Sequence, residues 1–278
     1  MKKVKMSKVA DTTITYAILI VVSFIFLFPV LWLLLASFSK TGSMYSFNGF
    51  FPKEYSFDSF KKLFADTTMY NYPRWFINTL KISGFSCLFG TILVILTAYT
   101  MSRFKFRSRK NLMKATLVLG MFPSFMAMTA VYIMMTQFNL INQHWGLILI
   151  YSANAPMGYM VQKGFFDTIS GSIDEAARID GASSLMIFIR IILPLSLPII
   201  VFTSLTAFAW PWSDFILPKL LLKEKDLYTV AVGLMSLGDE EFARFSAGSM
   251  FIAVPIIILY FCLVKFLING LSSGAVKE

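Results

Sequence analysis

The sequence predicts an all-α integral membrane protein with six transmembrane helices. Composition and hydropathy are the first observations behind this prediction. Of the 278 residues, 57% are hydrophobic and only 14% are charged, whereas soluble domains carry about 25% charged residues. The mean hydropathy is +0.69. A soluble enzyme is therefore not expected.

Six apolar runs are long enough to cross a bilayer, which takes about 20 residues for roughly 30 Å of hydrocarbon. The first run is longer than the apolar core of a signal peptide and lacks a small-residue cleavage site, so we expect an uncleaved helix. We expect residues 1–13 to form a cytoplasmic segment, residues 14–269 one six-helix domain, and residues 270–278 a cytoplasmic tail. The six runs are residues 14–37, 75–102, 112–135, 145–165, 191–215 and 247–269.

The distribution of charge predicts the orientation of these helices. The loops on the side of the N-terminus hold 15 basic and 6 acidic residues, and the opposite loops hold 10 and 9. Because Lys and Arg near helix ends are retained in the cytoplasm, both termini are predicted to be cytoplasmic. The segment "SRFKFRSRK", residues 102–110, contributes most to this asymmetry. The basic pI of about 9.5 then reflects topology and not a nucleic-acid partner.

Residues typical of catalysis or metal binding are scarce. The chain has no G-x-x-x-x-G-K-[ST] phosphate-binding loop and no Gly-Lys dipeptide, so ATP would have to be hydrolysed by another polypeptide. His144 is the only histidine and lies beside Trp145 at a predicted outer interface. Cys87 and Cys262 lie within predicted spans, where packing is their expected role. We predict no catalytic residue, no metal site and no cofactor bound by this chain.

A charged stretch interrupts the apolar pattern between the fourth and fifth spans. It reads "DEAARIDGASSLMIFIRIILPLSLP", residues 174–198, and belongs to a predicted cytoplasmic loop. Ser172 and Glu175 match a capping box, which predicts a short helix that starts at Ser172. Gly181 is suited to a positive φ and would end this helix. An ion pair of Asp174 with Arg178 is possible at i, i+4.

A second helix is expected to follow at an angle. Its apolar residues recur at helical spacing, and prolines mark the point where it joins the fifth span. The residues with this spacing are Leu185, Phe188, Ile189 and Ile192.

The spacing of this loop resembles the "EAA" signature of ABC importer permeases. The resemblance implies a type I importer permease fold in which the loop, residues 170–194, carries a cytoplasmic coupling helix. In that family the helix docks on a separate ATPase subunit and transmits its closure to the membrane helices. The matching positions are Glu175, Ala176, Ala177, Gly181, Ile191, Leu193 and Pro194.

Other segments narrow the resemblance to the smaller, second permease of maltose and maltodextrin importers. They include "WFINTLKIS", "AYTMSRFKFRSRK", "MFPSFMAMTAVYIMM", "GFFDTI" and the C-terminal "INGLSSGAVKE". The resemblance implies a bacterial plasma membrane location and several partners: a second homologous permease, two ATPase subunits that use ATP and Mg, and an extracellular sugar-binding protein. Maltodextrin is the first candidate substrate, and raffinose or galacto-oligosaccharides are the alternative.

The resemblance also suggests where sugar passes. In related permeases the segment about 35 to 39 residues after the signature glutamate lines the path, and the end of the fourth span supplies the other wall. An alternative is that the tryptophans belong to an interfacial aromatic belt. The candidate residues are Trp210, Trp212, Ser213 and Asp214 in the fifth span, and Tyr151, Asn154 and Met157 in the fourth.

Two other classes of protein fit the sequence less well. A secondary transporter should show inverted repeats and ionisable groups at interrupted helices, and neither is clear in this sequence. A membrane-embedded enzyme would need clustered His, Asp or Glu at membrane depth, whereas the chain has a single His. An ATP-driven oligosaccharide importer subunit is therefore the favoured prediction.

Overall fold

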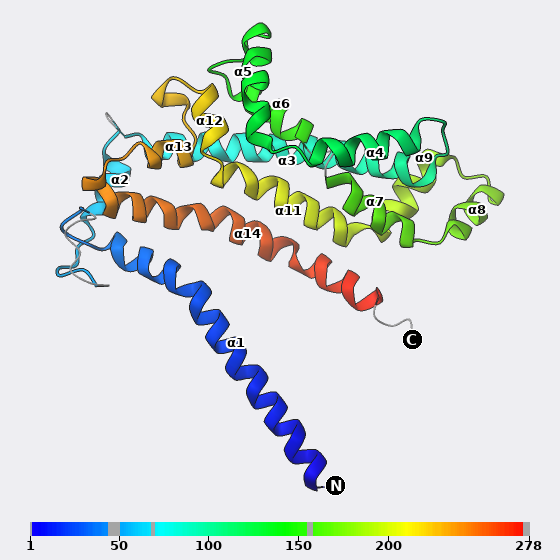
Figure 1. Ribbon diagram of the computed structural model, residues 1–278, viewed down its shortest axis with the longest axis horizontal. Coiled ribbons are helices and arrows are strands. Elements are labelled where there is room, and N and C mark those ends of the chain that lie inside the picture. Colours follow the sequence, from blue (N-terminus) through cyan, green and yellow to red (C-terminus); the bar gives the residue numbers. More distant parts are fainter. Residues whose placement is uncertain (1, 44–50, 68–69, 155–157, 275–278) are drawn as a thin grey trace. The chain divides into compact units, whose positions relative to one another are not determined.

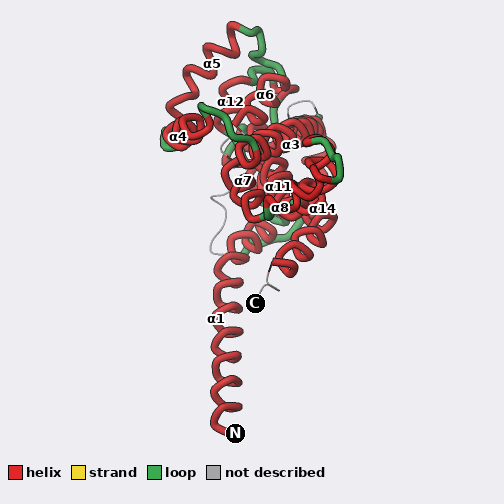
Figure 2. The backbone as a smooth tube through the Cα atoms, turned by 90° about the vertical axis from the view of Figure 1, so that its right-hand side faces the viewer, coloured by secondary structure: helices red, strands yellow, loops and turns green. Residues whose placement is uncertain are grey.

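The structure is a computed structural model that describes residues 2–43, 51–67, 70–154 and 158–274, and the side chains of residues 12–43, 51–67, 70–123, 125–153 and 158–266. Helices and loops make up these ranges, as Figure 2 shows. The only β-type pairing in them is an isolated bridge between Ser39 and Tyr55. The predicted all-α class is confirmed.

The long helices carry the apolar runs, and shorter ones fill the connections (Figure 1). The α-helices are α1 (Lys2–Ser37), α2 (Asp58–Ala65), α3 (Tyr72–Arg103), α4 (Arg109–Gly120), α5 (Met128–Gln137), α6 (His144–Asn154), α7 (Tyr159–Thr168), α8 (Gly171–Ile179), α9 (Ser184–Ile187), α10 (Leu193–Leu195), α11 (Leu197–Ser213), α12 (Ile216–Leu221), α13 (Val230–Met235) and α14 (Phe242–Gly274). A π-helix spans Phe188–Ile192, and 3₁₀ turns span Ser124–Ala127, Lys225–Leu227 and Asp239–Glu241.

The chain divides into two compact units. The first comprises Met1–Asn71 and Leu234–Phe251. Within it, the buried Arg244 guanidinium lies 3.1 Å from Asp66 Oδ2 and 3.2 Å from Glu241 Oε2. The aromatic ring of Phe64 makes an edge-on contact with Phe251, with ring centroids 5.3 Å apart. These contacts join the end of α2 to the first turns of α14.

The second unit comprises Tyr72–Gly233 and Ile252–Glu278 and contains the candidate site. Helix α3 is its central element and packs along α11, α6 and α7. Towards the C-terminal end of α3, a hydrophobic cluster joins α3, α7, α9 and the π-helix. Its buried members are Val94, Ile95, Ala98, Tyr99, Tyr159, Phe166, Ile187, Phe188 and Ile192.

Three helices of the described chain are long and apolar enough to cross a membrane: Thr12–Ser37, Tyr72–Arg103 and Asp239–Phe266. Two further candidates are bent pairs, Arg109–Gly120 with Phe125–Gln137 at 92° and Ser184–Leu195 with Leu197–Ser213 at 78°. These five segments coincide with five of the six predicted spans. The predicted fourth span, 145–165, corresponds to α6 and α7, but it includes residues 155–157, which lie outside the described ranges.

Candidate functional site

Helix α8 forms within the predicted coupling loop, but it begins one residue earlier than the sequence indicated. Ser170, not Ser172, is the N-cap, and its hydroxyl accepts a hydrogen bond from Ser172 N at 3.3 Å. The prediction of a start at Ser172 was therefore wrong, because Gly171 is already helical. Two serines at this spacing offer competing caps, and pattern alone does not choose between them.

The joint after α8 has the conformation that the sequence predicted. Gly181 adopts a φ of +84°, a region that L side chains resist. Ala182 N donates to Ala177 O at 2.9 Å, and Gly181 N donates to Arg178 O at 3.0 Å, which satisfies the last carbonyls of α8. Ser183 then caps α9 by accepting a hydrogen bond from Met186 N at 3.3 Å. Two helical arms thus meet at Gly181, which has a left-handed backbone conformation. The first arm is α8, and the second arm is Ser184–Leu195, which comprises α9, the π-helix and α10.

The signature residues of α8 fall on different faces of the helix. Glu175 and Ala176 are exposed, whereas Ala177 is half-buried and packs against the hydrophobic cluster around Tyr99. Ile179, one turn from Glu175, is 87% exposed. An outward face with small and apolar residues is therefore available to another polypeptide.

The second arm departs from the predicted helical spacing. Phe188 and Ile192 are buried as expected, but Leu185 is 66% exposed and Ile189 is 52% exposed. The physical reason for the exposure of Ile189 is the π-helix Phe188–Ile192, in which Leu193 N donates to Phe188 O, five residues earlier. This wider turn aligns Ile187 with Ile192 on the buried face.

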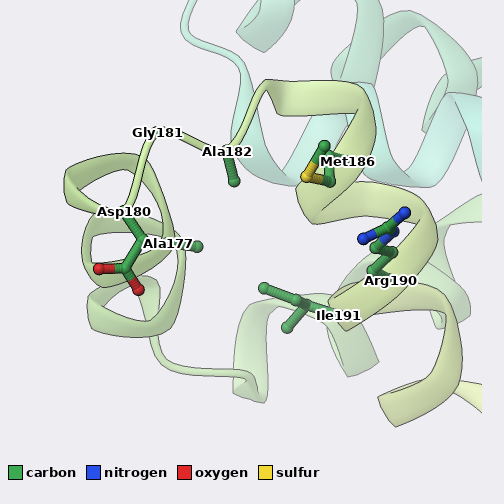
Figure 3. Close-up of a pocket in the computed structure, with 7 residues that line it drawn as sticks. All are labelled: Ala177, Asp180, Gly181, Ala182, Met186, Arg190 and Ile191. Carbon is green, nitrogen blue, oxygen red and sulfur yellow. The ribbon is translucent and has the colours of Figure 1, made fainter.

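An open hollow of about 470 Å³ separates the two arms. Ala177 on α8 and Ile191 on the π-helix point toward each other across it (Figure 3). Of the other signature residues, Leu193 packs against the hydrophobic cluster and Pro194 is exposed in α10. Both arms thus expose part of the signature. The hollow is lined by Ala177, Asp180, Gly181, Ala182, Met186, Arg190 and Ile191.

Asp174 does not form an ion pair with Arg178. Its Oδ2 instead lies 3.0 Å from Nε of Arg103, the last residue of α3. Nearby, Ser102 Oγ donates to Asp167 Oδ1 at 2.6 Å, and Lys163 Nζ donates to Asp167 Oδ2. Partial burial opposes ionisation of Asp167, but the hydrogen bonds from Lys163 and Ser102 outweigh it and hold the pKa of this carboxyl below its ordinary value.

The structure brings together only some of the residues that were predicted to line the sugar pathway. Tyr151 OH donates to Asp214 Oδ2 at 2.9 Å, which joins α6 to the end of α11. The other oxygen of Asp214 accepts from Ile216 N at 3.1 Å and Leu217 N at 3.4 Å, so this carboxylate also caps α12. Asp214 therefore holds three helices at one point.

The two tryptophans of α11 lie in different environments, one buried and one exposed. Trp212 is 1% exposed and makes an edge-on contact with Phe76, with ring centroids 5.0 Å apart. Packing against α3 therefore buries Trp212 within the chain in this structure, and its assignment to the pathway wall stays a prediction. Trp210 is 63% exposed and Ser213 is exposed, so both remain candidates. Met157 lies outside the described residues, as does the side chain of Asn154.

The start of α3 holds the segment 225–230 by contacts that the sequence analysis did not identify. Trp75 Nε1 donates to Lys225 O at 2.8 Å, Asn78 Nδ2 donates to Asp226 O at 2.8 Å, and Thr79 Oγ1 accepts from Val230 N at 2.8 Å. All three residues belong to "WFINTLKIS". The sequence feature that could have identified these contacts is the presence of polar residues along the start of an apolar helix.

Gly233 and Asn142 complete the attachment of this outer loop. A Cβ on Gly233 would lie 2.0 Å from Trp75 Cε3, so only glycine permits the observed packing. Asn142, with a φ of +58°, accepts hydrogen bonds from Lys223 N and Glu224 N. A single-sequence pattern has no signal for such long-range backbone contacts.

The only histidine has a structural contact. His144 Nε2 lies 2.9 Å from Leu227 O, at the same outer loop. No group of three or more His, Cys, Asp or Glu residues suited to a metal ion occurs in the described part of the chain.

Comparison with known proteins gives a consistent result. The family profile described as "Binding-protein-dependent transport system inner membrane component" matches residues 90–277. The galactooligosaccharides transport system permease protein of Bacillus subtilis is 37% identical over 268 residues, 95% of this chain and 94% of its own length. The maltodextrin transport system permease protein of Streptococcus pneumoniae is 37% identical over 279 residues, 99% of this chain and 98% of its own.

Solved structures share the fold. A chain from the crystal structure of a bacterial ABC transporter involved in the import of the acidic polysaccharide alginate aligns with a TM-score of 0.74 and 20% identity, covering 93% of this chain and 97% of that chain. A second crystal structure, of a bacterial alginate ABC transporter in complex with alginate pentasaccharide-bound periplasmic protein, aligns with a TM-score of 0.66.

Proposed function

Because the chain belongs to the family of inner membrane components of binding-protein-dependent transport systems, we propose that it is one permease subunit of an ATP-driven oligosaccharide importer. It would span the bacterial plasma membrane six times with both termini in the cytoplasm. A second, homologous permease would complete the pathway, and an extracellular sugar-binding protein would deliver the substrate.

Maltodextrin is the proposed substrate, and galacto-oligosaccharide is the second candidate. Permeases named for each sugar are 37% identical to this chain over nearly its whole length. A further maltodextrin permease, from Bacillus subtilis, is 36% identical over 268 residues. The exposed Trp210 and Ser213, beside the Tyr151–Asp214 hydrogen bond, would offer an apolar surface and hydroxyl partners to a passing sugar.

The observation that carries the proposed mechanism is the geometry of α8 and its joint. The helix presents Glu175 and Ala176 outward, and the left-handed Gly181 sets the angle to the next arm. We infer that α8 docks on a separate ATPase. That subunit would bind ATP and Mg and hydrolyse the ATP, because this chain has no phosphate-binding loop. Movement of the docked helix would then alternate access to the pathway.

The direct test is uptake of labelled maltodextrin and labelled galacto-oligosaccharide in cells that lack this chain, with and without the restored gene. Restored maltodextrin uptake that needs the ATPase gene, and that survives collapse of the ion gradients, supports the proposal. Uptake of galacto-oligosaccharide alone would select the second candidate. Uptake that follows the ion gradient and ignores the ATPase would refute an ATP-driven mechanism.

A further inference from the structure

The last turns of α3 contact both arms of the loop around Gly181. Arg103 Nε lies 3.0 Å from Asp174 Oδ2 in α8, and Arg103 Nη2 donates to Ile169 O at 3.0 Å, just before α8. Tyr99 lies four residues earlier on α3, on the same face of the helix. Its hydroxyl donates to Ser184 O at 3.3 Å in the second arm.

The ion pair is shielded from water. The Arg103 and Asp174 side chains are 13% and 12% exposed, whereas both partners of the Arg74–Asp226 pair are more than half exposed. Exposed pairs contribute little to stability because water and salt screen them. Loss of one partner of a shielded pair leaves an uncompensated charge, which is strongly unfavourable. Arg103 and Asp174 are thus expected to move together.

Neighbouring carboxylates on α8 face different environments. Asp174 is buried against α3, while Glu175 is exposed, and its carboxylate makes no ion pair or hydrogen bond with any described residue. Successive residues of a helix point about 100° apart because a turn takes about 3.6 residues. One carboxylate therefore holds α8 to α3, and the next one is available to a partner.

The second arm is held to α3 by an aromatic contact. The Tyr99 ring lies 4.5 Å, centroid to centroid, from Phe188 of the π-helix. The same ring makes edge-on contacts with Phe166 and Phe104. Because close-packed cores deform little, this arm and the end of α3 form one rigid group. Arg103 then connects α8 to that group.

We propose that Arg103 is a positioning residue that transmits displacement of α8 to α3 through its ion pair with Asp174. This inference rests on the proposed function, because α8 must be the helix on which the ATPase acts. The ion pair would make α8 and α3 move as one element, so that closure of the ATPase repositions a membrane helix. Without the pair, α8 would still dock, but its movement would not reach α3.

The experiment uses the complete transporter reconstituted in liposomes, with the charge reversals Arg103→Asp and Asp174→Arg, separately and combined. Each single reversal is expected to lower uptake by about fivefold or more, the usual lower range of an allosteric coupling. ATPase copurification and basal ATP hydrolysis are expected to persist, so that more ATP is hydrolysed for each sugar imported. The double reversal should restore much of the uptake. The matched control, Arg107→Asp, changes an exposed arginine in the turn that follows α3 and should keep wild-type uptake.

Further variants separate the possible failures. Ala176→Asp alters the exposed, proposed docking face, and if it leaves copurification and uptake unchanged, the coupling function itself is wrong. If Ala176→Asp acts as expected while Arg103→Asp keeps wild-type uptake, or while the double reversal is no better than the singles, the positioning role of Arg103 is overturned. Where a reversal lowers permease abundance, Arg103→Lys and Arg103→Gln replace it. Lys should keep more transport per ATP than Gln, and equal values would also overturn the proposal.

Discussion

Substitution of Gly181 by Val tests the joint between the two arms. The φ of +84° lies in the region where an L side chain is strained. No atom lies within 4 Å of the position that a Cβ would occupy. A larger side chain therefore meets open space, and its whole effect must come from the backbone.

The expected cost is about 1–3 kcal/mol, the range for a residue held in a sparsely populated backbone conformation. Relief of this strain requires a change of φ, which changes the angle between α8 and the second arm. Asn tolerates the left-handed region better than other non-glycine residues, so Gly181→Asn is the matched variant. Gly171→Ala is a second control, since Gly171 has an ordinary φ and open space around a Cβ.

Uptake, ATPase copurification and permease abundance are measured for all three variants. We expect Gly181→Val to abolish most uptake, Gly181→Asn to retain a substantial part of it, and Gly171→Ala to match the wild type. Abundance should stay near normal because no membrane-facing residue changes. Equal uptake by the Val and Asn variants would refute the argument from backbone strain.

Three further predictions concern topology and packing. In a variant without native cysteines, a membrane-impermeant thiol reagent outside the cell should label Cys at Ser236 and miss Cys at Ser108, and the opposite pattern would invert the topology. Trp212→Ala should destabilise the permease by about 3–5 kcal/mol, whereas Trp210→Ala should leave the melting temperature unchanged in detergent. Equal melting temperatures for these two variants would contradict the burial of Trp212. Asn142→Ala should cost about 1–2 kcal/mol because Ala resists a positive φ, and Asn142→Gly should cost less by the same thermal assay.

Local rules explain the features that the sequence by itself determined. Apolar runs of sufficient length predicted an all-α chain and coincide with three membrane-length helices and two bent helix pairs of the described chain. Gly181 was identified because a helix that ends at a sharp joint needs a residue able to adopt a positive φ. The spacing around Glu175 carried the family resemblance, and the match to the family confirms it. Each of these signals depends on residues close together in the chain.

Only the tertiary structure decided which partners the polar and aromatic residues take. Asp174 had Arg178 within reach on its own helix, yet it pairs with Arg103, 71 positions earlier in the chain. Trp210 and Trp212 look alike in the sequence, but α3 covers only one of them.

The second arm also shows that tertiary packing decides which residues are buried. Its π-helix aligns Ile187 with Ile192 on the buried face, while Leu185 and Ile189, which share a face at a regular helical period, are exposed. These outcomes depend on contacts between distant segments, which exist only once the helices have packed. Spacing along the chain therefore predicts helices and joints, while packing selects the partners of each side chain.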